Sequence, residues 1–138
     1  MSQVTITKIV EGAAHLIVRM DLLSDGSGEL LNQVVLSPSD LFPPRPNNHP
    51  AFRIMQLWYG CVWFDVVLGY ATLNPQPVWT IARDSDSHVD FRCFGGLRDY
   101  ATVPPGDSNG KLWVSTNGFN TAGSEGTVVL ELRKINAP

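Results

Sequence analysis

The chain has 138 residues, of which 43% are hydrophobic and 17% charged, and its formal net charge is −3. This length predicts one domain, residues 1–138, with a core large enough to fold without disulfides or metals. Because a globular average is about 25% charged, the surface is unusually neutral, and long polar disorder is excluded. The Lys and Arg residues are scattered singly, which excludes the basic stripe that nucleic-acid binding requires.

No apolar run is long enough to span a bilayer, so no membrane partner is expected. The residues from Met1 to Thr5 lack the charged and apolar regions of a signal peptide, which predicts synthesis in a cytoplasm. The two cysteines, Cys61 and Cys93, lie in apolar runs and belong to no C-x-x-C motif. We expect buried free thiols rather than a disulfide or a zinc site.

Alternation of apolar and polar residues predicts the first strands. Val4–Val10 is one strand, and His15–Leu23 is the clearest. A glycine-containing segment, residues 24–28, follows it, and Leu30–Leu36 is predicted to return as the hairpin partner of His15–Leu23. The predicted apolar face of His15–Leu23 consists of Leu16, Val18, Met20 and Leu22.

Residues 37–50 contain five prolines, which lack the amide donor of a sheet ladder and favour an extended preceding residue. We interpret the segment as an ordered crossing between sheets or as an arm. A Pro-x-x-Pro match at Pro43–Pro46 would also fit an aromatic groove of a partner. A stiff connection is favoured, because such matches arise wherever prolines cluster.

Aromatic and β-branched runs predict the later strands. Phe52–Trp58 and Val62–Leu68 are interpreted as neighbouring strands or as one long bent strand. The second is apolar on both faces, which places it centrally or against a second layer. The remaining predicted strands are Val78–Ala82, Val89–Phe94 before a break at Gly95 and Gly96, Lys111–Thr116, and Thr127–Ile135 with Val128, Leu130 and Leu132 inward and Glu131 and Arg133 outward.

About nine short strands, without an amphipathic helix that has credible caps, predict an all-β domain. We expect an antiparallel β-sandwich with a jelly-roll or Greek-key path and little helix.

One polar cluster, from Asp84 to Asp90, has an acidic or imidazole side chain at every second position. On an extended chain these groups would project to one side and could bind Ca²⁺ or a transition metal. The glycine and terminal glutamate of an EF-hand loop are missing. We therefore favour a solvated turn and predict no metal and no cofactor.

Hydrolytic chemistry is not favoured. The three histidines accompany no G-x-S-x-G elbow, and the sequence around Asp65, Asp99 or Glu131 marks none of them as a catalytic carboxylate. We predict no enzymatic activity and no catalytic residue.

The four tryptophans are compatible with a sugar-binding platform, because exposed rings can stack on pyranose faces. Most of them are expected in the core. Trp63 and Trp79 are expected to be more exposed than Trp58 and Trp113, because each is out of phase with the more aliphatic face of its strand.

Six segments from residue 53 onwards form a common pattern: Arg53–Tyr59, Trp63–Leu68, Pro77–Ala82, the Gly95–Gly96 break, Gly110–Thr116 and Val128–Lys134. With them, the stretch from about residue 53 to the C-terminus resembles the small all-β virion proteins of tailed bacteriophages. These proteins include capsid decoration, or cement, subunits. The resemblance implies a non-enzymatic protein that binds the outside of the head as an oligomer and locks neighbouring shell subunits together.

We therefore expect a virion structural protein, made in the host cytoplasm and located on the capsid surface. Its expected partners are the major capsid protein and copies of itself, as a homotrimer. The alternative is a carbohydrate-binding β-sandwich module on a tail or receptor-binding assembly, with a glycan as its partner. The residues expected at the interface are Val4, Ile6, Phe42, Pro43, Pro44, Arg45, Trp63 and Trp79.

Overall fold

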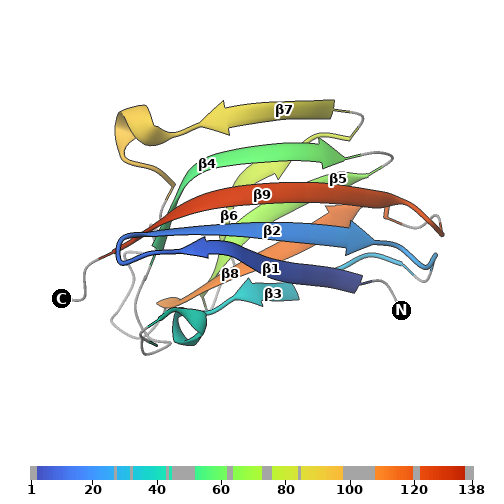
Figure 1. Ribbon diagram of the computed structural model, residues 1–138. Coiled ribbons are helices and arrows are strands. Elements are labelled where there is room, and N and C mark those ends of the chain that lie inside the picture. Colours follow the sequence, from blue (N-terminus) through green and yellow to red (C-terminus); the bar gives the residue numbers. More distant parts are fainter. Residues whose placement is uncertain are drawn as a thin grey trace.

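The computed structural model describes residues 3–26, 28–31, 33–42, 44, 52–61, 64–72, 76–83, 85–97, 108–119 and 122–135 (Figure 1). The strands are β1 (Gln3–Glu11), β2 (His15–Leu23), β3 (Gln33–Leu36), β4 (Phe52–Cys61), β5 (Asp65–Thr72), β6 (Gln76–Ile81), β7 (Ser85–Asp90), β8 (Ser108–Asn117) and β9 (Glu125–Lys134). Two 3-10 helices are η1 (Pro38–Asp40) and η2 (Arg92–Phe94). Within these ranges, no helix has the length and apolarity to cross a membrane.

The strands form two antiparallel sheets packed face to face. The five-stranded sheet has the order β1-β2-β9-β4-β7 and is the front layer in Figure 1, and the four-stranded sheet has the order β3-β8-β5-β6. Four pairings are nested along the chain: β5 with β6, β4 with β7, β3 with β8, and β2 with β9. Such nesting is a long antiparallel ribbon rolled around a core, which is the jelly-roll path. The predicted antiparallel sandwich is confirmed, with β1 added at one edge.

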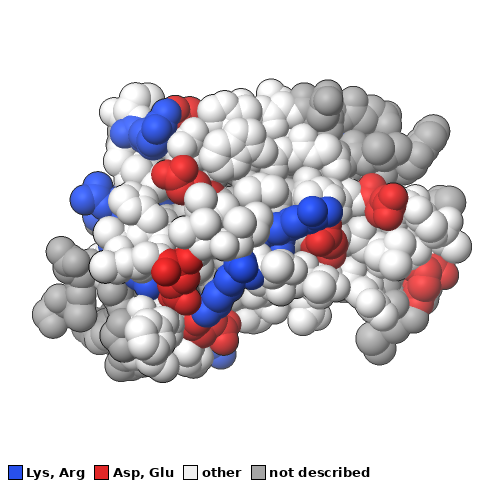
Figure 2. Space-filling model, viewed as in Figure 1, with Lys and Arg blue, Asp and Glu red and all other residues white. Residues whose placement is uncertain are grey.

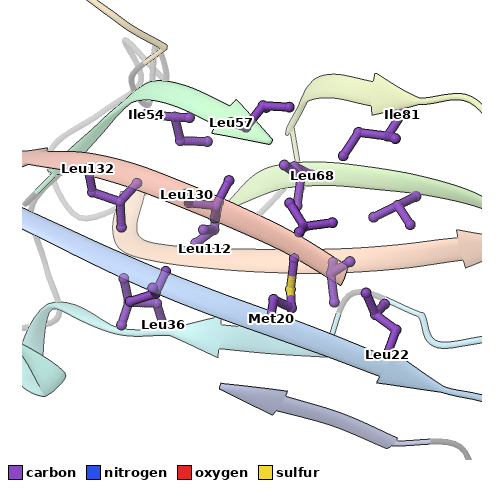
Figure 3. Close-up of a cluster of buried hydrophobic side chains, with 14 of the residues drawn as sticks. Met20, Leu22, Leu36, Ile54, Leu57, Leu68, Ile81, Leu112, Leu130 and Leu132 are labelled. Carbon is purple, nitrogen blue, oxygen red and sulfur yellow. The ribbon is translucent and has the colours of Figure 1, made fainter. Parts of the chain in front are cut away.

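The core lies between the two sheets (Figure 3). Alternate residues of β2, β5 and β9 supply much of it, and β3, β4, β6 and β8 contribute further buried side chains. β2 and β9 pair in unbroken register from His15 to Leu23, so their apolar faces join into one surface. On the opposite face of β9, Glu131 is half-buried and Arg133 is exposed, as the alternation predicts. The core residues of these two strands are Leu16, Val18, Met20, Leu22, Val128, Leu130 and Leu132, each at most 2% exposed.

The hairpin predicted between His15–Leu23 and Leu30–Leu36 is wrong. β3 begins only at Gln33 and pairs with β8 in the opposite sheet. Hydrogen bonds direct the chain there: the Leu30 amide donates to Thr116 Oγ1 (2.9 Å), and the Thr116 amide donates to the Leu30 carbonyl (3.0 Å). The chain after β2 therefore crosses to the other layer instead of turning back.

β4 and β5 are neither neighbours nor one bent strand, because they lie in different sheets. β4 ends at Cys61 in the five-stranded sheet, and β5 begins at Asp65 in the four-stranded sheet. The expectation that the second run lies centrally and against another layer is correct, since Val66 and Leu68 are fully buried and β5 has a neighbour on each side.

The strand predicted at Val89–Phe94 is displaced, because β7 ends at Asp90 and η2 follows. The break at Gly95 and Gly96 is confirmed, and both have φ near +90°. A side chain on Gly96 would meet Met55 Sδ at 2.6 Å. Cys93, expected to be buried, is an exposed free thiol, because it lies on this turn rather than on the inner face of a strand.

The proline-rich segment, residues 37–50, is described at residues 37–42 and 44. Its first part is η1, where the Ser37 amide donates to Asp40 Oδ2 (2.8 Å). Leu41, which follows η1, is 2% exposed and belongs to the core. The beginning of the predicted crossing is therefore packed against the sandwich.

The assignment of faces on β9 predicts the outcome of two neighbouring substitutions. Leu130→Ala should lower the free energy of unfolding by about 2–5 kcal/mol, because it leaves a cavity between the sheets. Val129→Ala, on the half-buried outer face, should lower the free energy of unfolding much less. Urea denaturation of both variants measures the difference, and equal losses would contradict the assigned faces.

Candidate functional site

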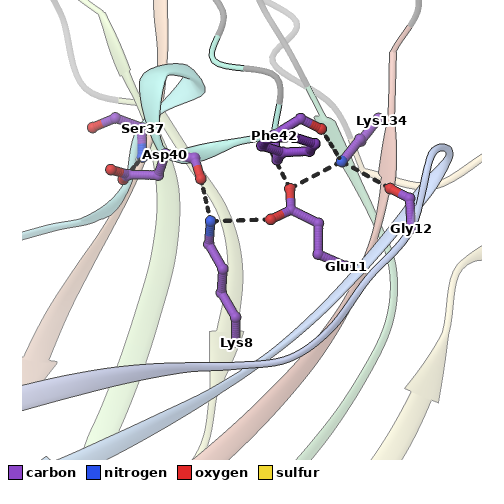
Figure 4. A network of polar contacts seen from close by, with 7 residues as sticks. All are labelled: Lys8, Glu11, Gly12, Ser37, Asp40, Phe42 and Lys134. Atoms are coloured by element: carbon purple, nitrogen blue, oxygen red, sulfur yellow. Dashed lines mark hydrogen bonds and ion pairs between the residues drawn. The ribbon is translucent and has the colours of Figure 1, made fainter.

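A polar network ties the end of β1 to the start of the proline-rich segment (Figure 4). The Lys134 side chain is only 3% exposed, and its Nζ donates to Glu11 Oε2 (2.9 Å) and to the carbonyls of Gly12 (2.8 Å) and Phe42 (2.9 Å). Glu11 Oε2 also accepts the Phe42 amide (2.8 Å), and Glu11 Oε1 accepts Lys8 Nζ (3.2 Å). Lys8 donates in addition to the last carbonyl of η1. These bonds fix the Phe42 backbone against the end of β1.

The charges of this network depend on one another. Burial acts to raise the pKa of Glu11, but hydrogen bonds from Lys134, the Phe42 amide and Lys8 outweigh it and lower that pKa from 4.5 to about 2. Glu11 is therefore ionised at neutral pH and balances the buried ammonium of Lys134.

Exposed apolar side chains concentrate at the edge formed by β1 and β3, which lie along the same margin of the two layers in Figure 1. Of the seven large hydrophobic residues exposed in the described part of the chain, five lie on β1, in or just before β3, or just after η1. We call these five the edge surface: Ile9 (54% exposed), Val10 (52%), Leu31 (76%), Val34 (40%) and Phe42 (77%).

The outer face of the five-stranded sheet carries an aromatic and polar group centred on Trp58. Trp58 is 37% exposed and stacks on His88 of β7, with ring centroids 4.9 Å apart and an interplanar angle of 8°. Beside this pair, Gln56 Oε1 lies 2.8 Å from His88 Nε2, and Gln56 Nε2 donates to Glu131 Oε2 (2.9 Å). The bonds hold His88 against the indole, so the pair is a fixed feature of the surface.

Two shallow depressions meet on this face at Gly60 and Thr127. The first, about 470 Å³, lies beside Trp58 and is floored by Val129. The second, about 490 Å³, extends over β2 to Arg19 and Asp21. We call the two together the sheet-face groove.

The structure places the predicted interface residues in different parts of the molecule. Val4 and Ile6 are half-buried on β1 and pack against the core, whereas Phe42 and Pro44 are exposed. Trp79 lies on β6, at the margin of the four-stranded sheet away from β3, so it is not brought together with the others. Pro43, Arg45 and Trp63 lie outside the described residues.

The tryptophans are distributed differently from the expectation. Trp79 is half-buried and packs edge to face on Phe91, at 4.9 Å and 72°. Trp113 is 4% exposed, and Trp58 is the exposed one among the three tryptophans that the structure describes. The alternation Leu57, Trp58, Tyr59 could have indicated an outward Trp58, but its partner His88 follows only from the pairing of β4 with β7.

The polar cluster from Asp84 to Asp90 is not a turn, because residues 85–90 form β7 and pair with β4. His88 contacts Trp58 and Gln56, and Asp90 forms an ion pair with Arg92 (2.7 Å). Asp84 lies outside the described residues. In the described part of the chain, no three His, Cys, Asp or Glu side chains are grouped so as to hold a metal ion.

No protein-family model matches the chain, and no curated protein is similar to it. Its fold is weakly similar to a cupin superfamily protein from Desulfitobacterium hafniense (7% identity, TM-score 0.35, 97% of this chain and 79% of that chain). It is also weakly similar to a family 11 carbohydrate-binding module from Clostridium thermocellum (12% identity, TM-score 0.31, 99% of this chain and 84% of that chain). A third weak similarity is to the VP2 subviral particle of infectious bursal disease virus (11% identity, TM-score 0.27, 96% of this chain and 32% of that chain). Scores this low carry no argument about family or function.

The network around Glu11 predicts a specific dependence of stability on pH. Because the pKa of Glu11 is lowered in the folded protein, its stabilising contribution is complete above pH 4.5 and is lost as the pH falls towards about 2. Glu11→Gln should lower the melting temperature at pH 7 and reduce the further loss between pH 5 and pH 2.5. Glu125→Gln, at an exposed position on β9, is the control. If Glu11→Gln keeps the full acid sensitivity of the wild type, the network does not carry this effect.

Proposed function

We propose that the protein is a non-enzymatic virion structural protein, a capsid decoration subunit that binds the outside of a bacteriophage head as an oligomer. The observation that supports this function best is the edge surface. Monomeric soluble proteins expose apolar residues mostly as scattered single side chains, and a concentration of them marks a contact with another protein. Here Ile9, Val10, Leu31, Val34 and Phe42 gather at one margin.

The backbone at this margin is also suited to association. Among the strands that the structure describes, β1 and β3 each have a neighbour on one side only. The first half of β1, residues 3–7, has no charge and no proline, the features by which natural edge strands avoid pairing with other chains. Lys8 and the register shift between Lys8 and Val10 interrupt only its second half. A strand from another subunit could therefore add to β1 over Gln3–Thr7.

The charge distribution favours short-range adhesion over long-range steering. On the face shown in Figure 2, acidic and basic groups lie scattered or beside one another rather than in a field of one sign. The ion pairs include Arg19 with Asp21 (3.0 Å) and Arg92 with Asp90 (2.7 Å). A surface of this kind loses little charge solvation when it is covered, which suits a subunit whose contacts are repeated by symmetry.

The partners in this proposal are the major capsid protein and copies of the chain itself, arranged as a trimer on the capsid surface. The alternative of a carbohydrate-binding module loses the support it drew from Trp79, because this side chain is half-buried against Phe91. A sugar site elsewhere on the molecule would be compatible with decoration of a capsid.

Substitutions at the edge surface test the proposal. Val10→Lys and Val34→Lys should abolish oligomer formation and binding to empty phage heads, because each places a charge in the apolar contact. Thr80→Lys, an exposed change on β6 at the other margin, should preserve both. Light scattering measures the oligomer, and co-sedimentation with heads of the phage that carries the gene measures binding.

Two results would overturn the proposal. One is a wild-type protein that stays monomeric at high concentration and does not sediment with heads. The other is the absence of the chain, by mass spectrometry, from purified virions of that phage.

A further inference from the structure

The sheet-face groove shares no residue with the edge surface and has a different chemistry, although its polar end reaches Gln3 and Thr5 of β1. Its apolar wall is Trp58, one face of which is covered by His88, while the depression opens beside the ring over Val129 and Thr127. A flat exposed indole next to a hollow is a surface on which a ligand with an apolar ring face can stack.

Gly60 creates the hollow next to Trp58. It is exposed in β4, its neighbours across the sheet are Thr127 of β9 and Asp86 of β7, and a Cβ added to it would meet no atom within 4 Å. The floor of the groove at this point is therefore backbone, which gives a ligand access to the side of the indole.

Polar groups lie at the other end of the groove. Asp21 Oδ1 accepts Arg19 Nε (3.0 Å) and Thr127 Oγ1 (3.1 Å), which holds its carboxylate in place. The side chains of Arg19 and Asp21 are 52% and 40% exposed, so a guanidinium and a carboxylate both remain accessible to a ligand. Planar, bidentate groups of this kind bind neighbouring hydroxyls with defined geometry.

The charges in the groove do not favour an anionic ligand. Arg19 is paired with Asp21, and Glu125 adds a further exposed carboxylate to the same depression. Arg19 is aligned with Val129 of β9, and Val129 is aligned with Trp58 of β4. Two strand spacings, about 10 Å, therefore separate the polar end from the ring. A ligand that used both would be longer than one pyranose ring.

From these features we propose that the sheet-face groove binds a neutral saccharide of two or more pyranose units. One ring stacks on Trp58 above Gly60, and the hydroxyls of the next bond to Arg19, Asp21 and Thr127. An apolar protein segment is not favoured, because it would offer no hydroxyl or other polar partner to the accessible groups of Arg19 and Asp21, which already pair with each other.

The test is a titration of the full chain with neutral oligosaccharides of two to six hexose units, chosen from a glycan array and followed by tryptophan fluorescence and calorimetry. Wild type should bind at least one. Trp58→Ala should lose about tenfold or more in affinity, as expected for truncation of a central aromatic contact. Gly60→Val should have the same effect by filling the hollow, in a position where the fold has room for the side chain. Phe42→Ala, a change at an exposed aromatic residue of the edge surface, is the matched control and should bind normally.

Three results would overturn the saccharide site: no neutral saccharide bound by the wild type, undiminished binding by both groove variants, or dissociation of an oligomer by Trp58→Ala, which would show that a second copy covers this face. The first two of these results do not depend on capsid binding, so failure of the saccharide site is distinguishable from failure of the decoration function. In the same way, loss of head binding in Val10→Lys with normal saccharide binding would separate the two surfaces.

Discussion

The burial of one shared apolar face on β2 and β9 is the constraint on which the rest of the structure depends. These strands are far apart in the sequence, yet they pair over nine positions without a shift of register. Every second side chain of both strands is thereby committed to the core. The side chains between them are fixed on the outer face at strand spacing, and there they form part of the floor and the polar end of the sheet-face groove. The recognition surface is thus a direct consequence of the packing of the core.

The local alternation of residues predicted much of this fold, and its success depended on contrast between the two faces of a strand. His15–Leu23 was predicted with its observed bounds, and the inward and outward residues of β9 were correct. Pairing was not predictable in the same way. The choice of β8 rather than β2 as the partner of β3 depends on contacts such as Leu30 with Thr116, which are 86 positions apart. A glycine-containing turn after a strand carries no information about such a partner.

The candidate surfaces were predicted less well, for two physical reasons. On β4 the register shift between Ile54 and Gln56 changes the phase of the strand, so Ile54 and Leu57 both face inward. Alternation counted from Phe52 and Ile54 therefore places Trp58 on the inner face, although Trp58 is exposed. On β7 the Asp and Ser residues have the composition of a turn, and only pairing with β4 keeps them extended. The exposure of Phe42, by contrast, agrees with its place in the proline-rich segment that was expected to form an interface.

The position of β9 in its sheet affects how the nascent chain can fold. It follows every other strand in the sequence, but it occupies the middle of its sheet, between β2 and β4. While the ribosome is still translating the preceding strands, β2 and β4 each have one open edge and no common partner. The sheet closes only after residue 134 has emerged. A nascent chain of this kind exposes the open edges of β2 and β4 until β9 has been made, and long-range closure of this type is slow.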